Sequence, residues 1–166
     1  MLRNSIVIIF FSCLFMAGCM PSPFYQKEEA IPQNEWQYQF QPTFKFNITD
    51  TTSLYNIYFL IRHTDAYPYA NIWLWIYTKQ PGDSTFRKTR INIPLAEPSG
   101  KWLGRGMGEI YEQEMPITIE GDKSICKKKG TYEIRFEQNM RINPLPEVLH
   151  IGLRVEKAGA RNFSPR

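Results

Sequence analysis

Alternation of apolar and polar residues is the feature that most constrains this chain, and it recurs from Trp36 onward. Successive side chains of a β-strand point to opposite faces, so alternation gives a strand one apolar and one polar face. No segment here shows a sustained helical period, and β-branched and aromatic residues dominate. The pattern predicts strands within residues 90–95, 111–117, 132–137 and 149–156, and a further strand is expected at 44–48.

Two segments, Leu54–Ile61 and Asn71–Tyr77, carry apolar side chains on both faces. Each is therefore predicted to be a central strand that is covered on both sides. Residues 62–70 connect them and include Asp65 and Pro68, which are common in loops. One hypothesis is that the two strands form a hairpin with a long loop.

The number and spacing of the strands favour an all-β fold, a single antiparallel β-sandwich at residues 36–157. A jelly-roll-like sandwich is the main expectation, and an immunoglobulin-like sandwich is the alternative. Prolines and mixed charges predict that residues 19–35 are a flexible tether, and residues 158–166 are expected to be a C-terminal tail. The chain is long enough for one such domain with its own core, not for two.

Residues 1–18 have the pattern of a cleaved lipoprotein signal peptide. Arg3 precedes an unbroken apolar stretch from Ile6 to Met16, which is shorter than the about 20 residues that span a bilayer. The following Ala-Gly-Cys resembles the bacterial lipobox, so Cys19 is the predicted site of lipid attachment. Each buried methylene of an acyl chain contributes about 0.8 kcal/mol, so several chains would hold the protein on a membrane.

Charge and cysteine content exclude several classes of protein. Removing residues 1–18 takes away one of the 20 basic residues and none of the 16 acidic ones, which leaves a mature charge of +3. This small, dispersed excess on an exported chain gives no expectation of nucleic-acid binding, and Lys127–Lys129 are interpreted as a solvated turn. Cys126 would be the one free thiol, expected to be a small, partly buried side chain, so no internal disulfide is predicted. No cofactor or metal site is predicted.

His63 and Asp65 are the first candidates for chemistry, because residues two apart on an extended chain project to the same side. Such a pair can orient an imidazole for base catalysis or hold a metal. No nucleophile accompanies them, and the preferred interpretation is that Asp65 caps a turn and pairs with Arg62 or His63. The glycines within 104–108 lead into a predicted strand rather than a helix, so a nucleotide-binding loop is not favoured.

Asn71–Tyr77 places three aromatic side chains on one face and three aliphatic side chains on the other. Because tryptophan and tyrosine keep a polar group, the aromatic face is expected nearer to solvent or to a partner. Three interpretations stay open for these rings: core packing, a protein-binding surface, and stacking on sugar rings.

Two stretches then resemble a known family: YNIYFLIRHTDAYPYANIWLWIYTKQPGD (Tyr55–Asp83) and GKWLGRGMGEIYEQEMPI (Gly100–Ile117). In this order they closely resemble the gliding motility-associated lipoprotein family GldH of the Bacteroidetes. The resemblance extends over nearly the whole mature chain, including residues 130–157. It implies an envelope lipoprotein required for gliding, associated with the type IX secretion and motility machinery, with no catalytic residue assigned.

The sequence thus predicts a non-enzymatic accessory of that machinery, anchored by its lipid, expected in the outer membrane facing the periplasm. It would bind other envelope proteins, and a glycan-binding envelope module is the alternative. A hydrolase built on His63 and Asp65 is a third hypothesis. The residues expected to contact a partner lie on the aromatic strand and its flanking loops: Trp73, Trp75, Tyr77, Trp102, Arg62, His63 and Asp65.

Overall fold

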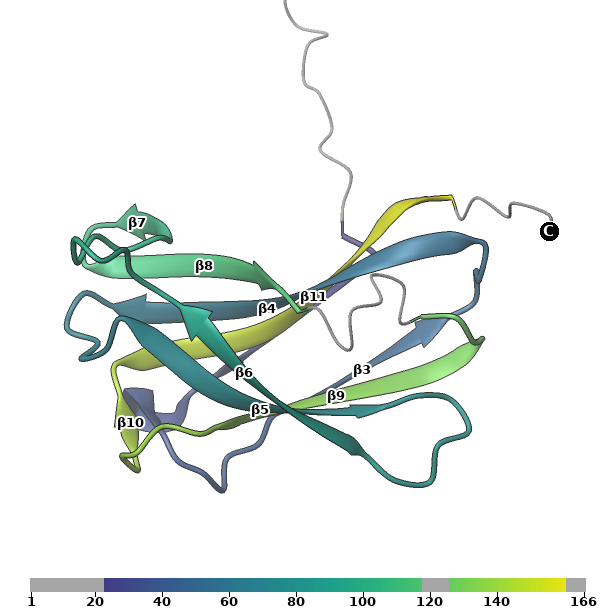
Figure 1. Cartoon of the computed structure of the whole chain (residues 1–166), viewed down its shortest axis with the longest axis horizontal. Coiled ribbons are helices and arrows are strands. Elements are labelled where there is room, and N and C mark those ends of the chain that lie inside the picture. Colours follow the sequence, from purple (N-terminus) through teal and green to yellow (C-terminus); the bar gives the residue numbers. More distant parts are fainter. Residues whose placement is uncertain (1–22, 118–125, 161–166) are drawn as a thin grey trace, which may run out of the picture.

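A computed structural model describes residues 23–117 and 126–160, which form two facing antiparallel sheets (Figure 1). In chain order the elements are β1 (Tyr25–Ala30), a short 3-10 helix η2 (Pro32–Asn34), β2 (Glu35–Trp36), β3 (Thr43–Ile48), β4 (Ser53–Thr64), β5 (Asn71–Lys79), β6 (Arg87–Pro94), β7 (Arg105–Met107), β8 (Ile110–Pro116), β9 (Gly130–Gln138), β10 (Leu145–Pro146) and β11 (Val148–Ala160). The five-stranded sheet has the order β1-β11-β4-β8-β7, and the four-stranded sheet has the order β3-β9-β5-β6. A third, two-stranded sheet joins β10 to β2.

The strand pairing defines a jelly roll. β1 pairs with β11, β3 with β9, β4 with β8, and β5 with β6. These four pairs are nested along the chain and alternate between the two sheets, which is the double Greek-key arrangement of a jelly roll. The predicted all-β sandwich is therefore confirmed, in its jelly-roll form.

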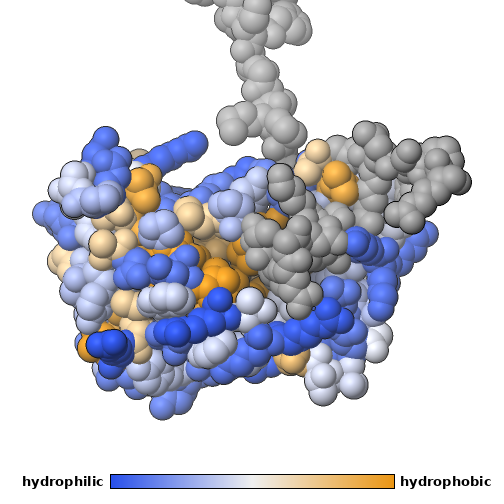
Figure 2. All heavy atoms as spheres, viewed as in Figure 1, coloured by the Kyte–Doolittle hydropathy of each residue, from blue (hydrophilic) through white to orange (hydrophobic). Residues whose placement is uncertain are grey.

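The core lies between the two sheets. Ile72, Leu74 and Ile76 of β5 are fully buried. Phe59 of β4 meets Phe136 of β9 across the layers, with ring centroids 4.9 Å apart and planes at 73°. In Figure 2 apolar residues gather between the layers and hydrophilic residues line the rims. Each large apolar side chain buried in this way contributes about 1.5–3 kcal/mol, so the core accounts for most of the stability.

The hairpin hypothesis for the two apolar strands is wrong. β4 pairs with β11 and β8 in one sheet, whereas β5 pairs with β6 and β9 in the other. Both strands are central, as predicted, so each already has two neighbours in its own sheet. The segment between them crosses from one layer to the other, and the Tyr67 hydroxyl donates to the carbonyl of Asn71 (3.1 Å) within this crossing.

The predicted tether is too long at its C-terminal end. Residues 25–30, expected to be flexible, form β1, which pairs with β11 over six residues. Tyr25 packs on Phe46 with ring centroids 5.6 Å apart, and Ile31 is only 3% exposed. β1 is an edge strand with few buried side chains, so its charged sequence YQKEEA lacks the apolar pattern from which a strand is predicted. At the other end of the domain, β11 continues three residues beyond the expected boundary at 157.

The predicted signal peptide and the lipid-attachment residue Cys19 lie outside the described residues. Within the described ranges, no helix has the length and apolar character needed to cross a membrane. Cys126 is fully buried, more deeply than expected, whereas Lys127–Lys129 are exposed just before β9, as interpreted from the sequence.

Candidate functional site

The outer face of the four-stranded sheet carries a row of half-buried aromatic rings. Trp73, Trp75 and Tyr77 point out of β5, because the residues between them are buried in the core. This confirms that the aromatic face lies nearer to solvent than the aliphatic one. Because β5 lies between β9 and β6, side chains from both neighbouring strands flank the row.

Basic side chains of β6 lie over these rings. The guanidinium carbon of Arg90 is 4.1 Å from the ring centroid of Trp73. The ammonium nitrogen of Lys88 is 4.3 Å from the ring centroid of Trp75 and 4.9 Å from that of Tyr77. Cation–π contacts of this kind contribute about 0.5–1 kcal/mol each at exposed sites. They hold both cations in defined positions over the sheet.

The same pattern continues on β9 and in the turn that precedes β6. The guanidinium carbon of Arg135 is 4.3 Å from the ring centroid of Phe86 and 5.4 Å from that of Tyr77, and the ammonium nitrogen of Lys79 is 5.8 Å from Phe86. We call this set of four rings and four cations the aromatic–cation ladder: Trp73, Trp75, Tyr77, Phe86, Lys79, Lys88, Arg90 and Arg135.

The carboxylates on the outer face of β9 have partners of their own. Glu137 accepts a hydrogen bond from the hydroxyl of Tyr77, and Glu133 pairs with Lys45 of β3 at 3.3 Å. Neither glutamate forms an ion pair with Lys79, Lys88 or Arg90 in the described part of the chain. The β5–β6 half of this face is therefore basic and aromatic.

His63 occupies a different environment, fully buried near the end of β4 among aromatic rings. Its ring centroid is 4.6 Å from that of Trp102, 5.3 Å from Tyr67 and 5.9 Å from Tyr111. The Nδ1 atom lies 2.7 Å from the carbonyl oxygen of Thr64, which assigns the proton to Nδ1. Burial lowers the pKa of His63 from its ordinary value of 6.5, so the ring is neutral at physiological pH.

Asp65 does not join His63. It is exposed in the turn after β4, and its backbone N–H donates to the carbonyl of Glu109 at 2.8 Å. The expected pairing of Asp65 with Arg62 or His63 is wrong, because the His63 ring points into the aromatic cluster and Arg62 pairs with other carboxylates. No group of three potential metal ligands occurs in residues 23–117 and 126–160. The described structure thus does not assemble the pair that a hydrolase or a metal site would use.

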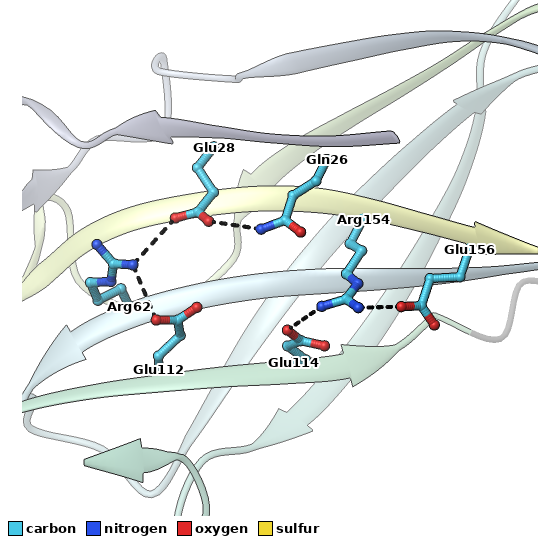
Figure 3. Close-up of polar contacts among 7 residues, drawn as sticks. All are labelled: Gln26, Glu28, Arg62, Glu112, Glu114, Arg154 and Glu156. Carbon is cyan, nitrogen blue, oxygen red and sulfur yellow. Dashed lines mark hydrogen bonds and ion pairs between the residues drawn. The ribbon is translucent and has the colours of Figure 1, made fainter. Parts of the chain in front are cut away.

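Arg62 lies on the outer face of the five-stranded sheet, on the opposite side of the sandwich from the aromatic–cation ladder. It pairs with Glu112 at 3.1 Å and with Glu28 at 3.8 Å. In Figure 3 two arginines of this face lie among four glutamates: Arg62, Arg154, Glu28, Glu112, Glu114 and Glu156. Among these six side chains the glutamates outnumber the arginines, and both arginines are paired.

The seven residues predicted to contact a partner thus fall in separate places. Three lie in the ladder, Trp102 packs on buried His63, Arg62 is on the far face, and Asp65 is in an exposed turn. The ladder cations were missed, because a basic residue on one strand meets a ring on another only through the sheet register. The signal present in the sequence was the Arg-Lys-Thr-Arg run at the start of β6.

The glycine-rich stretch at 104–108 contains β7 and the turn into β8, so the strand predicted to follow the glycines is confirmed. Met107 at the tip is 86% exposed. A small open pocket of about 300 Å³ lies between the start of β7 and β8, lined by Leu103, Gly104, Arg105, Glu112, Gln113 and Glu114.

Comparison with known proteins supports the resemblance seen in the sequence. The family model of the GldH lipoprotein matches residues 23–155. A protein of Christiangramia forsetii, named a gliding motility lipoprotein GldH homolog, is 26% identical over 163 residues, covering 93% of this chain and 96% of that protein. The gliding motility lipoprotein GldH of Flavobacterium johnsoniae is 22% identical over 163 residues, covering 94% and 98%.

A solved carbohydrate-binding module specific for non-crystalline cellulose overlaps 81% of this chain and 75% of its own, with a TM-score of 0.45 and 12% identity. This overlap is too low to bear on function. The family match and the full-length relatives instead define the class, a membrane-anchored envelope lipoprotein with an all-β sandwich domain. The chain belongs to the GldH lipoprotein family.

Proposed function

We propose that this lipoprotein is a non-enzymatic accessory of the gliding motility and type IX secretion machinery, and that it binds another envelope protein through the aromatic–cation ladder. Its full-length relatives are named as gliding motility lipoproteins, which supports the process. The observation that carries the binding surface is the row of tryptophan and tyrosine rings with arginines over them, because these three residue types dominate interface hot spots.

Anchorage at Cys19 agrees with this role. β1 begins at Tyr25, so five residues, or six residue-to-residue steps, separate the proposed lipid site from the folded domain. At about 3.4 Å per extended residue, the sandwich stays within roughly 20 Å of the membrane surface. We place the anchor in the outer membrane, facing the periplasm, where a short tether keeps the domain beside other envelope components.

A glycan-binding module is the second candidate, because a row of aromatic rings on a sheet face suits sugar stacking. The cations argue against it. Arg90 and Lys88 each cover one face of a tryptophan ring, and sugar stacking needs an open ring face. A glycan array probed with the soluble domain separates the two, since protein binding predicts no signal.

The test is co-purification of envelope proteins with the native acylated chain after gentle solubilisation. The double variant Trp73→Ala/Trp75→Ala removes two half-buried rings and is expected to lose at least about tenfold in the recovered partner, as for a hot-spot pair. Tyr58→Ala, on the outer face of the other sheet, is the matched control and should retain the partner. Full recovery with a folded double variant would contradict the proposed surface.

A further inference from the structure

We propose that the partner presents an extended acidic segment to the β5–β6 half of the aromatic–cation ladder, with carboxylates meeting Lys88 and Arg90. This inference rests on the proposed function and specifies the chemistry of the partner. The two outer faces of the sandwich differ in how their charged side chains are paired.

Among the described residues, the ladder face has five basic side chains, because Lys45 of β3 joins the four ladder cations, against two glutamates on β9. Those two glutamates are already engaged by Tyr77 and Lys45. In the turn before β6, Asp83 pairs with Arg87 at 4.0 Å. Each carboxylate on or beside this face thus has a partner, whereas no described carboxylate pairs with Lys79, Lys88 or Arg90.

Both β6 cations are exposed and positioned in advance. Each rests over an aromatic ring, which leaves N–H groups free to donate to a carboxylate. A partner carboxylate would displace no ion pair with a described residue, and each side chain would lose little conformational freedom on binding. This differs from Arg62 and Arg154 on the other face, which are already paired with glutamates.

The spacing of the two cations favours an extended segment. Lys88 and Arg90 are two residues apart on one strand, which places them about 7 Å apart on the same face. A partner chain in extended conformation presents alternate side chains at the same interval. Carboxylates at every second residue would match the cations, and apolar or aromatic side chains beside them would meet Trp73 and Trp75.

An anionic lipid surface is disfavoured by the position of the anchor. The tether enters the fold at β1, in the five-stranded sheet, while the ladder lies on the outer face of the opposite layer. The lipid-anchored edge of the sandwich and the basic face therefore belong to different layers (Figure 1).

The defined probe is a labelled twelve-residue peptide alternating glutamate and tyrosine, titrated against the full acylated chain in detergent micelles. A glutamine–tyrosine peptide of equal length is the neutral comparison. We expect the acidic peptide to bind about tenfold more tightly than the neutral one, and its affinity to fall at least about threefold between 50 and 300 mM salt through charge screening. Equal affinity of the two peptides would overturn the inference.

The variant Lys88→Gln/Arg90→Gln removes two exposed charges and is expected to weaken the acidic peptide about tenfold. Lys101→Gln/Lys129→Gln removes the same charge at exposed positions outside the ladder and should leave the affinity unchanged. Phosphatidylglycerol vesicles form the third arm, and binding of vesicles but not of peptide to the same face would assign it to lipid and overturn the inference.

Envelope co-purification separates the two levels of the proposal. If Lys88→Gln/Arg90→Gln keeps the native partner while Trp73→Ala/Trp75→Ala loses it, the surface is right and the acidic chemistry is wrong. If both double variants keep the partner, the proposed function itself fails. If both double variants lose the partner, and lowering the salt restores binding in neither variant, the result supports the proposed surface and the acidic chemistry of the partner.

Discussion

The aromatic residues of this domain fall into two groups, those that pack in its interior and those that are proposed to bind a partner. His63 and Trp102 are chemically conspicuous in the sequence, yet they pack against each other with ring centroids 4.6 Å apart in an aromatic cluster. Trp73 and Trp75 are the same residue type as Trp102, but they are half-buried on an outer face with cations over them. Residue type alone does not distinguish the two situations, because the difference arises from which face of which strand each ring occupies.

Buried His63 predicts a specific pH dependence of stability. Burial lowers its pKa, so below pH 6.5 the unfolded chain takes up a proton that the folded chain does not. The free energy of unfolding therefore falls as the pH drops below 6.5 towards the pKa of the folded state, with one proton setting an upper limit of about 1.4 kcal/mol per pH unit on the slope.

Urea unfolding of wild type and His63→Phe between pH 7.5 and 5 measures this contribution. Other groups titrate equally in both proteins, so the difference between the two curves isolates His63. We expect the wild type to lose stability relative to the variant as the pH falls, and parallel curves would show that His63 is not buried as a neutral ring.

At the level of elements, the sequence predicted the positions of most strands but not which strands pair with each other. Alternation located β6, β8, β9 and β11, and two-sided apolar character identified β4 and β5 as central. The hairpin assigned to β4 and β5 was wrong because nested jelly-roll pairs join strands far apart in the chain, and alternation carries no information about the partner. β1 was missed because an edge strand needs little apolar surface.

Gly152 of β11 tests how tightly β1 is held. A Cβ placed there would lie 2.7 Å from the carbonyl oxygen of Lys27 and 2.6 Å from Cγ of Glu28. Gly152→Ala is therefore expected to push β1 from β11 and to cost about 1–3 kcal/mol of stability. Hydrogen exchange should show faster exchange in residues 25–30, with β5 and β9 unchanged as the internal reference. Unchanged protection of β1 would contradict the close pairing.

For the whole molecule, the two outer faces have opposite character. One carries aromatic rings with Lys88 and Arg90, which pair with no described carboxylate, and on the other Arg62 and Arg154 are already paired with glutamates. With only five residues between the proposed lipid site and β1, this arrangement would hold the sandwich near a membrane while one basic, aromatic face stays available. None of this asymmetry was predicted from the sequence, because it depends on how the strands are divided between the two layers.

Site-specific photocrosslinking in living cells tests the central claim most directly. Asn92 is exposed on the outer face of β6, opposite Trp73 in the register, and a photoreactive residue there keeps every ring and cation of the ladder. Asn56 of β4, in the other sheet, is the matched control position. We predict that position 92 crosslinks to one envelope protein and that position 56 does not. No crosslinked species from position 92, or the same species from both positions, would contradict binding through the aromatic–cation ladder.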